Sequence, residues 1–394
     1  MNECARSPAY DVALVGGGLA NGLIALALIA RDPKRRFVLI ERASTLGGNH
    51  TWCFHCRDVP EQARAFFDPL VEHRWSGYDV HFPSFSRTID APYGCVSSAR
   101  FDGVVRAAVE SAPNATLITG VGVRHLDTHD VVLDDGRTLS ADLVVDGRGP
   151  ERDDWPKTGY QKFFGLEVEL ERPHALRRPL LMDATVPQRG GYRFFYVLPF
   201  SATRLLVEDT IFSHSADLDL DRARQTVLAF ADERGFRVRR VLREEHASLP
   251  MPYQGEPAAQ TSGPLRSGYR GGWFHPATGY SLPVALRLAL LVSDLPKNRV
   301  FGPELRSFYK AHLSQFRYAT FLNRMLFQWF EPEQMWNVFE RFNRLPSPVM
   351  GRFYAMELTA ADRARIMLGR PPRGMSLGGI RNAFRAFSHR EVPP

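Results

Sequence analysis

The fold is decided by a glycine-rich stretch near the start of the chain, DVALVGGGLANG, residues 11–22. The apolar letters before the glycines predict a buried strand, and the apolar run at residues 23–30 predicts the start of a buried helix. A second apolar strand, at residues 37–41, ends in the acid Glu41. This order of strand, glycine turn, helix, strand and acid is the dinucleotide-binding fingerprint in its structural context.

The chemistry of a dinucleotide explains the residue types in this stretch. Gly16 permits the turn, and Gly18 lets backbone N–H groups approach a pyrophosphate at the positive end of the helix. Glu41 is placed to accept hydrogen bonds from a ribose diol. The third position of the pattern carries Asn21 instead of glycine, with Gly22 beside it. The residues expected to bind the dinucleotide here are Gly16, Gly17, Gly18, Leu19, Ala20 and Glu41.

Three further segments indicate that the dinucleotide is FAD. An Arg and a Gly-Gly turn after Glu41 resemble the FAD-binding members of this class. An apolar strand with an acid–glycine turn at residues 141–149 looks like the second flavoprotein signature. The loop 272–283 before an apolar helix at 284–292 looks like the third. The expected FAD-binding residues in these segments are Arg42, Gly47, Gly48, Asn49, Asp146, Gly147, Gly149, Thr278, Gly279, Tyr280 and Ser281.

The chain is therefore predicted to be α/β, with a Rossmann-like FAD-binding domain of the glutathione-reductase kind built from residues 1–155 and 268–300. Period-2 alternation at 164–170, 192–198 and 204–212, with a hairpin turn at 199–203, predicts a β-rich substrate domain at 156–267. Residues 301–394 are predicted to form a helical, basic and aromatic C-terminal part.

The C-terminal part leaves two interpretations open. Aromatic and aliphatic residues recur at helical spacing from 316 to 342, which suits either a core stripe or an interfacial unit in lipid. The net charge of the chain is +7, and residues 341–394 contain ten Arg against three acids. This basic segment predicts contact with an anionic membrane surface, and the absence of a recognition motif argues against nucleic acid. The longest apolar run, at 23–30, is too short to span a bilayer.

The four cysteines, Cys4, Cys53, Cys56 and Cys95, are too few to staple a chain of 394 residues, which favours a reducing compartment. Cys53 and Cys56 have redox or metal spacing. Because no second Cys pair accompanies them, we expect two half-buried thiols and no metal.

Taken together, these motifs resemble those of the bacterial lycopene β-cyclases, flavoproteins of carotenoid synthesis. The resemblance covers nearly the whole length and rests on residues 15–22, 48–52, 182–185, 206–210, 276–281 and 352–354. It implies cyclisation of both ψ-ends of lycopene to give β-carotene through γ-carotene. It also implies reduced FAD, NAD(P)H as electron source, lycopene drawn from the membrane, and a peripheral location on the cytoplasmic face of the inner membrane.

The family's acidic motif falls on residues 207–210. The resemblance assigns catalysis to the first acid, Glu208, and leaves the role of the second, Asp209, less defined. Adjacent residues on a strand face opposite sides, so the two acids cannot act as a dyad on one face. Pattern alone would bury Asp209, and either acid could instead end a surface strand or bind an Arg. A buried carboxylic acid with a raised pKa would suit protonation of an alkene.

Two competing functions share this scaffold. A flavin monooxygenase or isoprenoid reductase would consume NAD(P)H in proportion to product, whereas a cyclase would not. The stretch 275–279 lacks the Asp that such enzymes usually carry in the third signature, which counts against a hydroxylase. A non-catalytic flavin- or lipid-binding membrane adaptor would show no turnover.

Overall fold

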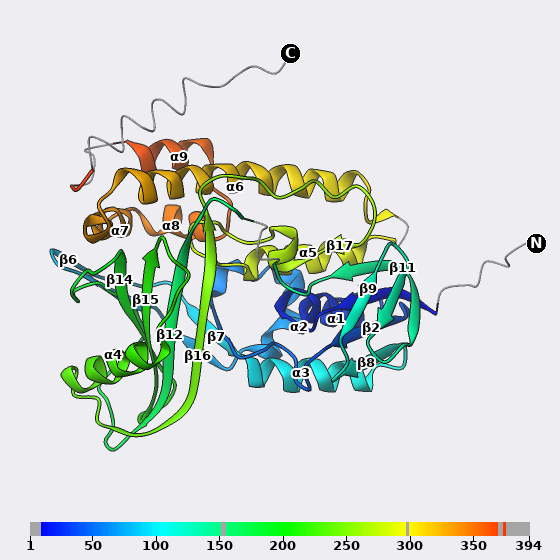
Figure 1. Ribbon diagram of the computed structural model, residues 1–394, viewed down its shortest axis with the longest axis horizontal. Helices are drawn as coiled ribbons and strands as arrows, with labels where there is room; N and C mark the ends of the chain where they lie inside the picture. Colours follow the sequence, from blue (N-terminus) through cyan, green and yellow to red (C-terminus); the bar gives the residue numbers. More distant parts are fainter. Residues whose placement is uncertain (1–8, 151–154, 297–298, 369–372, 376–394) are drawn as a thin grey trace, which may run out of the picture.

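A computed structural model describes residues 9–150, 155–296, 299–368 and 373–375. Two seven-stranded sheets lie side by side, and the helices of the C-terminal part lie along one end of the second sheet (Figure 1). A smaller sheet has three strands in the order β3-β7-β4, which are β3 (Thr51–His55), β7 (Tyr93–Ser97) and β4 (His73–Trp75).

The first sheet has the strand order β8-β2-β1-β11-β10-β9, with β17 on the edge of β11. Its central strand β1 pairs in parallel with β2 and β11, as a βαβ unit requires. The strands are β1 (Tyr10–Val15), β2 (Phe37–Glu41), β8 (Ala115–Thr119), β9 (Val123–Leu126), β10 (Asp130–Leu133), β11 (Thr138–Asp146) and β17 (Leu265–Arg266).

Helix α1 is buried because apolar side chains surround it. It spans Leu19–Arg31 and packs against α5 (Leu282–Asp294) and α3 (Ser98–Ser111). The ring of Phe101 on α3 lies where a side chain on Gly22 would sit, since a Cβ there would be 2.2 Å from it. Gly22 therefore lets the two helices approach closely. The predicted strand, glycine turn, helix and second strand are confirmed.

The second sheet has the order β16-β12-β15-β14-β13-β5-β6 and is antiparallel except where β13 meets β5. Its strands are β12 (Thr158–Leu170), β13 (Leu180–Asp183), β14 (Tyr192–Pro199), β15 (Arg204–Ser213), β16 (Val238–Pro252), β5 (Tyr78–Phe82) and β6 (Phe85–Ile89). The predicted hairpin turn is confirmed, because β14 ends at Pro199 and β15 begins at Arg204. Two strands from within residues 1–155, β5 and β6, also join this sheet; the domain boundaries remain predictions.

Successive side chains along the strands of the second sheet point to opposite faces, and both faces are apolar. One face packs on α4 (Leu220–Glu233), where the ring of Phe195 stacks on Phe230 with centroids 3.7 Å apart. Helix α4 lies across this outer face in Figure 1. The opposite face, with Tyr192, Phe194 and Phe212, is turned toward the C-terminal helices.

The predicted helical C-terminal part is present where the structure describes it. Its helices are α6 (Pro303–Trp329), α7 (Trp336–Asn343), α8 (Ser347–Tyr354) and α9 (Ala360–Met367); the short α2 is Arg64–Phe67. A capping box of Thr359 and Asp362 starts α9. Within the described ranges, no helix combines the length and apolar character that crossing a membrane would need. Part of the basic segment, 369–372 and 376–394, lies outside the described residues.

Candidate active site

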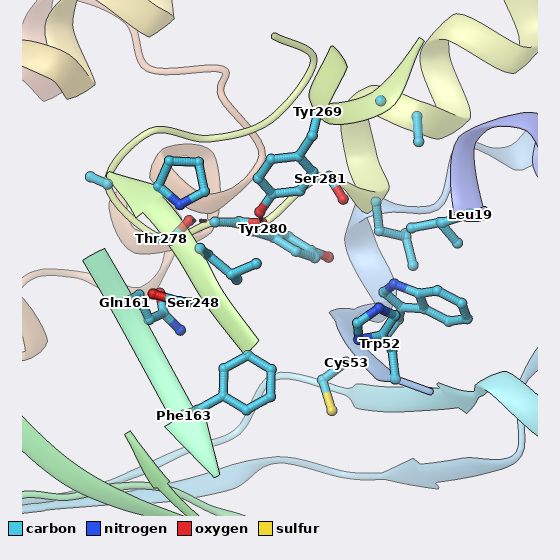
Figure 2. Close-up of a pocket in the computed structure, with 18 of the residues that line it drawn as sticks. Leu19, Trp52, Cys53, Gln161, Phe163, Ser248, Tyr269, Thr278, Tyr280 and Ser281 are labelled. Carbon is cyan, nitrogen blue, oxygen red and sulfur yellow. Dashed lines mark hydrogen bonds between the residues drawn. The ribbon is translucent and has the colours of Figure 1, made fainter. Parts of the chain in front are cut away.

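A large cavity of about 1230 Å³ runs from the glycine turn of the first sheet to the second sheet and the C-terminal helices. Figure 2 shows Leu19 and Trp52 on one side of it and Gln161, Phe163 and Ser248 on the other. Residues of the loop before α5, among them Thr278, Tyr280 and Ser281, lie between the two groups in this view. The cavity therefore joins the predicted dinucleotide site to the predicted substrate domain.

The glycine turn forms a cradle at one end of the cavity. Gly16 has a φ of +94°, and a Cβ on it would lie 2.6 Å from the carbonyl oxygen of Gly147. A Cβ on Gly18 would meet nothing within 4 Å, so the space beside Gly18 is open. Helix α1 begins here with no side-chain cap, which leaves the N–H groups of its first turn available to an anion.

Polar side chains hold this turn in place. Glu41 accepts hydrogen bonds from the backbone N–H of Gly17 at 2.7 Å and of Ala43 at 2.9 Å, and it lines the cavity. Asn21 donates to the carbonyl oxygens of Val15 and Gly16, both at 2.9 Å, which explains its presence where the pattern has glycine.

Most of the predicted FAD-binding residues line this cavity: Gly16, Gly18, Leu19, Ala20, Glu41, Arg42, Gly47, Gly48, Gly147, Gly149, Thr278, Gly279, Tyr280 and Ser281. Three others, Gly17, Asn49 and Asp146, are not among its lining residues. Asn49 instead donates to the carbonyl oxygen of Glu244 and accepts from Arg243.

The carboxylate of Asp146 is directed at two arginines. It forms ion pairs with Arg148 at 2.9 Å and Arg270 at 2.6 Å. Burial acts to raise the pKa of Asp146, but these arginines hold it below the ordinary value. Asp146 thus stabilises the turn that carries Gly147 and Gly149 to the cavity.

The loop before α5 is tied to the segment after β3. The hydroxyl of Tyr280 donates to Oδ2 of Asp58 at 3.0 Å. Burial raises the pKa of Asp58 to about 7, and its Oδ1 has no hydrogen-bond partner among the described residues. His275, in the stretch without the usual Asp, is buried, and burial lowers its pKa to about 3, so that it is neutral.

Glu208 faces the cavity from β15. Its Oε1 accepts a hydrogen bond of 2.8 Å from the hydroxyl of Thr210, its neighbour on the same face. The side chain of Glu208 is half-buried, and its exposed part faces the cavity. Removal of the carboxyl from bulk water raises the pKa of Glu208 to about 8, and the charge of Glu245 is the next largest cause. The carboxyl is therefore neutral at pH 7 and able to donate a proton.

Asp209 faces the opposite side of the sheet, as expected for its neighbour on a strand. It lies with Val207 on the face that packs on α4, where Arg193 binds it. Of the two acids in the motif, Glu208 alone is among the residues that line the cavity.

The profile of the family described as Lycopene cyclase protein matches residues 11–378. The chain belongs to this family. It is 41% identical to the lycopene beta-cyclase of Pantoea ananas over 93% of this chain and 96% of that protein. It is 38% identical to the lycopene beta-cyclase of Paracoccus sp. over 92% of this chain and 94% of that protein.

Solved structures show the fold of this family member. A geranylgeranyl bacteriochlorophyll reductase-like protein from Thermoplasma acidophilum has a TM-score of 0.61 and 12% identity, covering 95% of this chain and 98% of the other. A flavin-dependent brominase has a TM-score of 0.61 and 14% identity, covering 97% and 100%. The predicted α/β class with a Rossmann-like flavoprotein fold is confirmed.

Sequence reasoning missed two acids of this site. Glu245 on β16 lines the cavity near Glu208, and Asp58 supports Tyr280. The alternation of β16 could have placed Glu245 on one face, but only the strand pairing shows which face that is. Asp58 ends a short 3-10 helix, Cys56–Asp58, and belongs to none of the sequence motifs.

The aromatic stripe of the C-terminal part is turned inward. Leu326, Phe330 and Met335 are buried, and the other members are at least half-buried. The members that line the cavity are Leu322, Met325, Leu326, Phe330, Phe339 and Phe342. The described helices thus use this stripe as core and cavity wall.

Cys53 and Cys56 are half-buried free thiols, as predicted, and Cys95 is a buried free thiol. In the described part of the chain, no three potential ligands of the His, Cys, Asp and Glu types are grouped to hold a metal ion.

Proposed function

We propose that this member of the lycopene cyclase family is a lycopene β-cyclase, which closes both ψ-ends of lycopene into β-rings and gives β-carotene through γ-carotene. The observation that carries the proposal is Glu208, a carboxyl kept neutral in an apolar cavity that also contains the dinucleotide cradle. The identity to curated bacterial lycopene beta-cyclases supports the same substrate.

The residues of the cradle fit FAD. The open space beside Gly18, the uncapped start of α1 and the carboxylate of Glu41 suit a pyrophosphate and a ribose. PqsL of Pseudomonas aeruginosa, a probable FAD-dependent monooxygenase, has a similar fold, with a TM-score of 0.58 and 14% identity. We propose that reduced FAD is the active form and that NAD(P)H supplies its electrons. When bound, a reduced flavin would supply spread negative charge near a carbocation.

The reaction needs one proton in and one proton out for each ring. Glu208 gives its proton to the terminal alkene, and the cation closes on the neighbouring double bond. The carboxylate left on Glu208 then accepts a proton from the ring, which restores the neutral acid. No electrons are gained or lost, because substrate and product are isomers. Aromatic and aliphatic walls, including Phe163, Phe194 and Phe339, exclude the water that would trap the cation.

The substrate is a hydrocarbon dissolved in membrane, so we propose a peripheral enzyme on the cytoplasmic face of the inner membrane, docked through its C-terminal region. The cavity reaches Arg341, Ile366, Met367 and Met375 in this region. Leu368, next along the chain, is 72% exposed. An arginine beside exposed aliphatic side chains suits an anionic lipid surface.

Expression in cells that accumulate red lycopene tests the proposal. The wild-type chain is expected to shift the pigment to yellow-orange bicyclic product, and Glu208→Gln at equal protein level is expected to leave it red. Unchanged colour with the wild type would refute a cyclase. Consumption of NAD(P)H in proportion to product would instead indicate a monooxygenase or an isoprenoid reductase.

A further inference from the structure

Two acids face each other across a single glycine on the cavity face of the second sheet. Gly165 on β12 is the register partner of Glu208 on β15 and of Glu245 on β16. Residues paired across neighbouring strands share a face, so these three residues form one row. Both glutamates line the cavity.

Gly165 leaves the room that the two acids occupy. A Cβ at this position would lie 3.2 Å from Cγ of Glu245 and 3.4 Å from Cβ of Glu208. Cδ1 of Leu206 lies 3.3 Å from the same point, so Gly165 leaves room for three neighbouring side chains and adds none of its own between the two acids.

The two acids have different partners. Glu245 is 2% exposed, accepts a hydrogen bond of 2.9 Å from the hydroxyl of Thr51, and forms an ion pair with Arg243. Glu208 accepts from the hydroxyl of Thr210, and no ion pair to it is found among the described residues. The surroundings thus favour a negative charge on Glu245 and a proton on Glu208.

We propose that Glu245 is a positioning residue of the cyclase, which acts across Gly165 to keep Glu208 in its proton-bearing form. This inference rests on the proposed function, because it assigns Glu208 as the acid. In a cavity of low dielectric, the negative charge of Glu245 acts across one intervening strand and opposes ionisation of Glu208. Arg243 forms its ion pairs with Glu245 and Glu167.

The charge of Glu245 adds to burial in raising the pKa of Glu208 to about 8. After burial and Glu245, three further groups act on the pKa of Glu208 in decreasing order. The hydrogen bond from Thr210 lowers it, the charge of Asp209 raises it, and the charge of Arg243 lowers it. The neighbouring titratable groups are Arg243 and Asp209, Glu167 paired with Arg243, Tyr196 opposite Glu208 on β14, and His50 near Glu245. Burial keeps His50 and Tyr196 neutral, by lowering the pKa of the first and raising that of the second.

An infrared titration of the full-length flavin-loaded protein tests this role directly. The C=O band of the protonated Glu208 carboxyl is assigned by its loss in Glu208→Gln. Its midpoint is expected near pH 8 in the wild type and about one pH unit lower in Glu245→Gln, from two charges about 10 Å apart. The pH at which kcat falls to half on the alkaline side is expected to be lower in Glu245→Gln by the same amount.

Glu244→Gln is the matched control. Glu244 precedes Glu245 on β16, forms an ion pair with Arg224, and is not among the cavity-lining residues. This variant is expected to leave the midpoint unchanged. In Glu245→Gln, Arg243 still pairs with Glu167, so the variant is expected to fold.

Should Glu245→Gln not fold, the double variant Arg243→Gln/Glu245→Gln removes both charges together. It is expected to lower the midpoint by less than about one pH unit, because the charge of Arg243 acts in the opposite direction and is the weaker of the two. An unchanged midpoint in a folded variant of either kind would overturn the role of Glu245. Because the titration needs no lycopene, a normal shift in a protein that does not convert lycopene would overturn the proposed function and leave the acid pair standing.

Discussion

Arg193 binds the carboxylate of Asp209 with two parallel hydrogen bonds, from Nε to Oδ1 at 2.8 Å and from a terminal nitrogen to Oδ2 at 2.9 Å. This pair lies between the second sheet and α4, away from the cavity. The two adjacent acids of the motif therefore have different roles. Glu208 faces the cavity, and Asp209 stabilises the sheet through its ion pair with Arg193.

Asp209→Ala is expected to lower the free energy of unfolding by roughly 3 kcal/mol, because it leaves a largely buried arginine without its partner. Denaturant unfolding measures the loss. Glu169→Ala is the control, since its partner Arg240 has a side chain that is 66% exposed, and it is expected to cost less than about 1 kcal/mol. Equal losses in the two variants would contradict the assigned role.

Glu208→Gln is expected to make the folded protein more stable at alkaline pH. The carboxyl has an ordinary pKa of 4.5 and one of about 8 in the fold. Between these values the folded chain binds more protons than the unfolded chain, so the stability of the wild type falls as pH rises. Glutamine removes this dependence. Melting temperatures at about pH 5 and about pH 9 should show the advantage of the variant growing with pH; a constant difference would argue against a raised pKa.

Gly18→Ala is expected to reduce bound flavin without much loss of stability, because its Cβ would enter the open cradle and touch no protein atom within 4 Å. Gly16→Ala is expected to lower both the bound flavin and the stability of the fold, since the φ of Gly16 is +94° and an added Cβ would collide with Gly147. Flavin absorbance and melting temperature of the purified variants measure the two effects. Gly103→Ala, at an open position on α3, is the control and should keep full flavin. Normal flavin content in Gly18→Ala would exclude this turn as the cofactor site.

Tyr280→Phe is expected to lower the free energy of unfolding by about 1 to 2 kcal/mol, because Asp58 loses its hydrogen-bond donor. The pKa of Asp58, about 7 in the fold, should rise further without this hydrogen bond. The loss should therefore be larger above pH 7, where Asp58 is ionised and accepts a stronger, charge-assisted bond. Denaturant unfolding on both sides of neutrality tests this, and a loss independent of pH would show that the Tyr280 hydroxyl does not support an ionised Asp58.

The elements that the sequence predicted well depend on local patterns. The strand, glycine turn and helix around Gly16, and the β14–β15 hairpin, are each contained in a short stretch with clear periodicity. The row of Glu208, Gly165 and Glu245 depends on pairing between three distant strands, and no local pattern encodes that register. For the same reason the ion pair of Asp146 with Arg270 was not foreseen, because Arg270 lies far along the chain.

The cavity wall includes residues from Val15 to Met375, so its closure waits for almost the whole chain. Helix α6, near the end of the chain, is held to β16 and to the loop before α5, because Asn323 donates to the carbonyl oxygens of Pro252 and Pro276. On the ribosome, the glycine turn at residues 16–18 emerges early, yet Gly147, the loop before α5 and the C-terminal walls emerge later. A nascent chain therefore completes its cofactor site and the apolar walls around Glu208 only after most of its length has been synthesised.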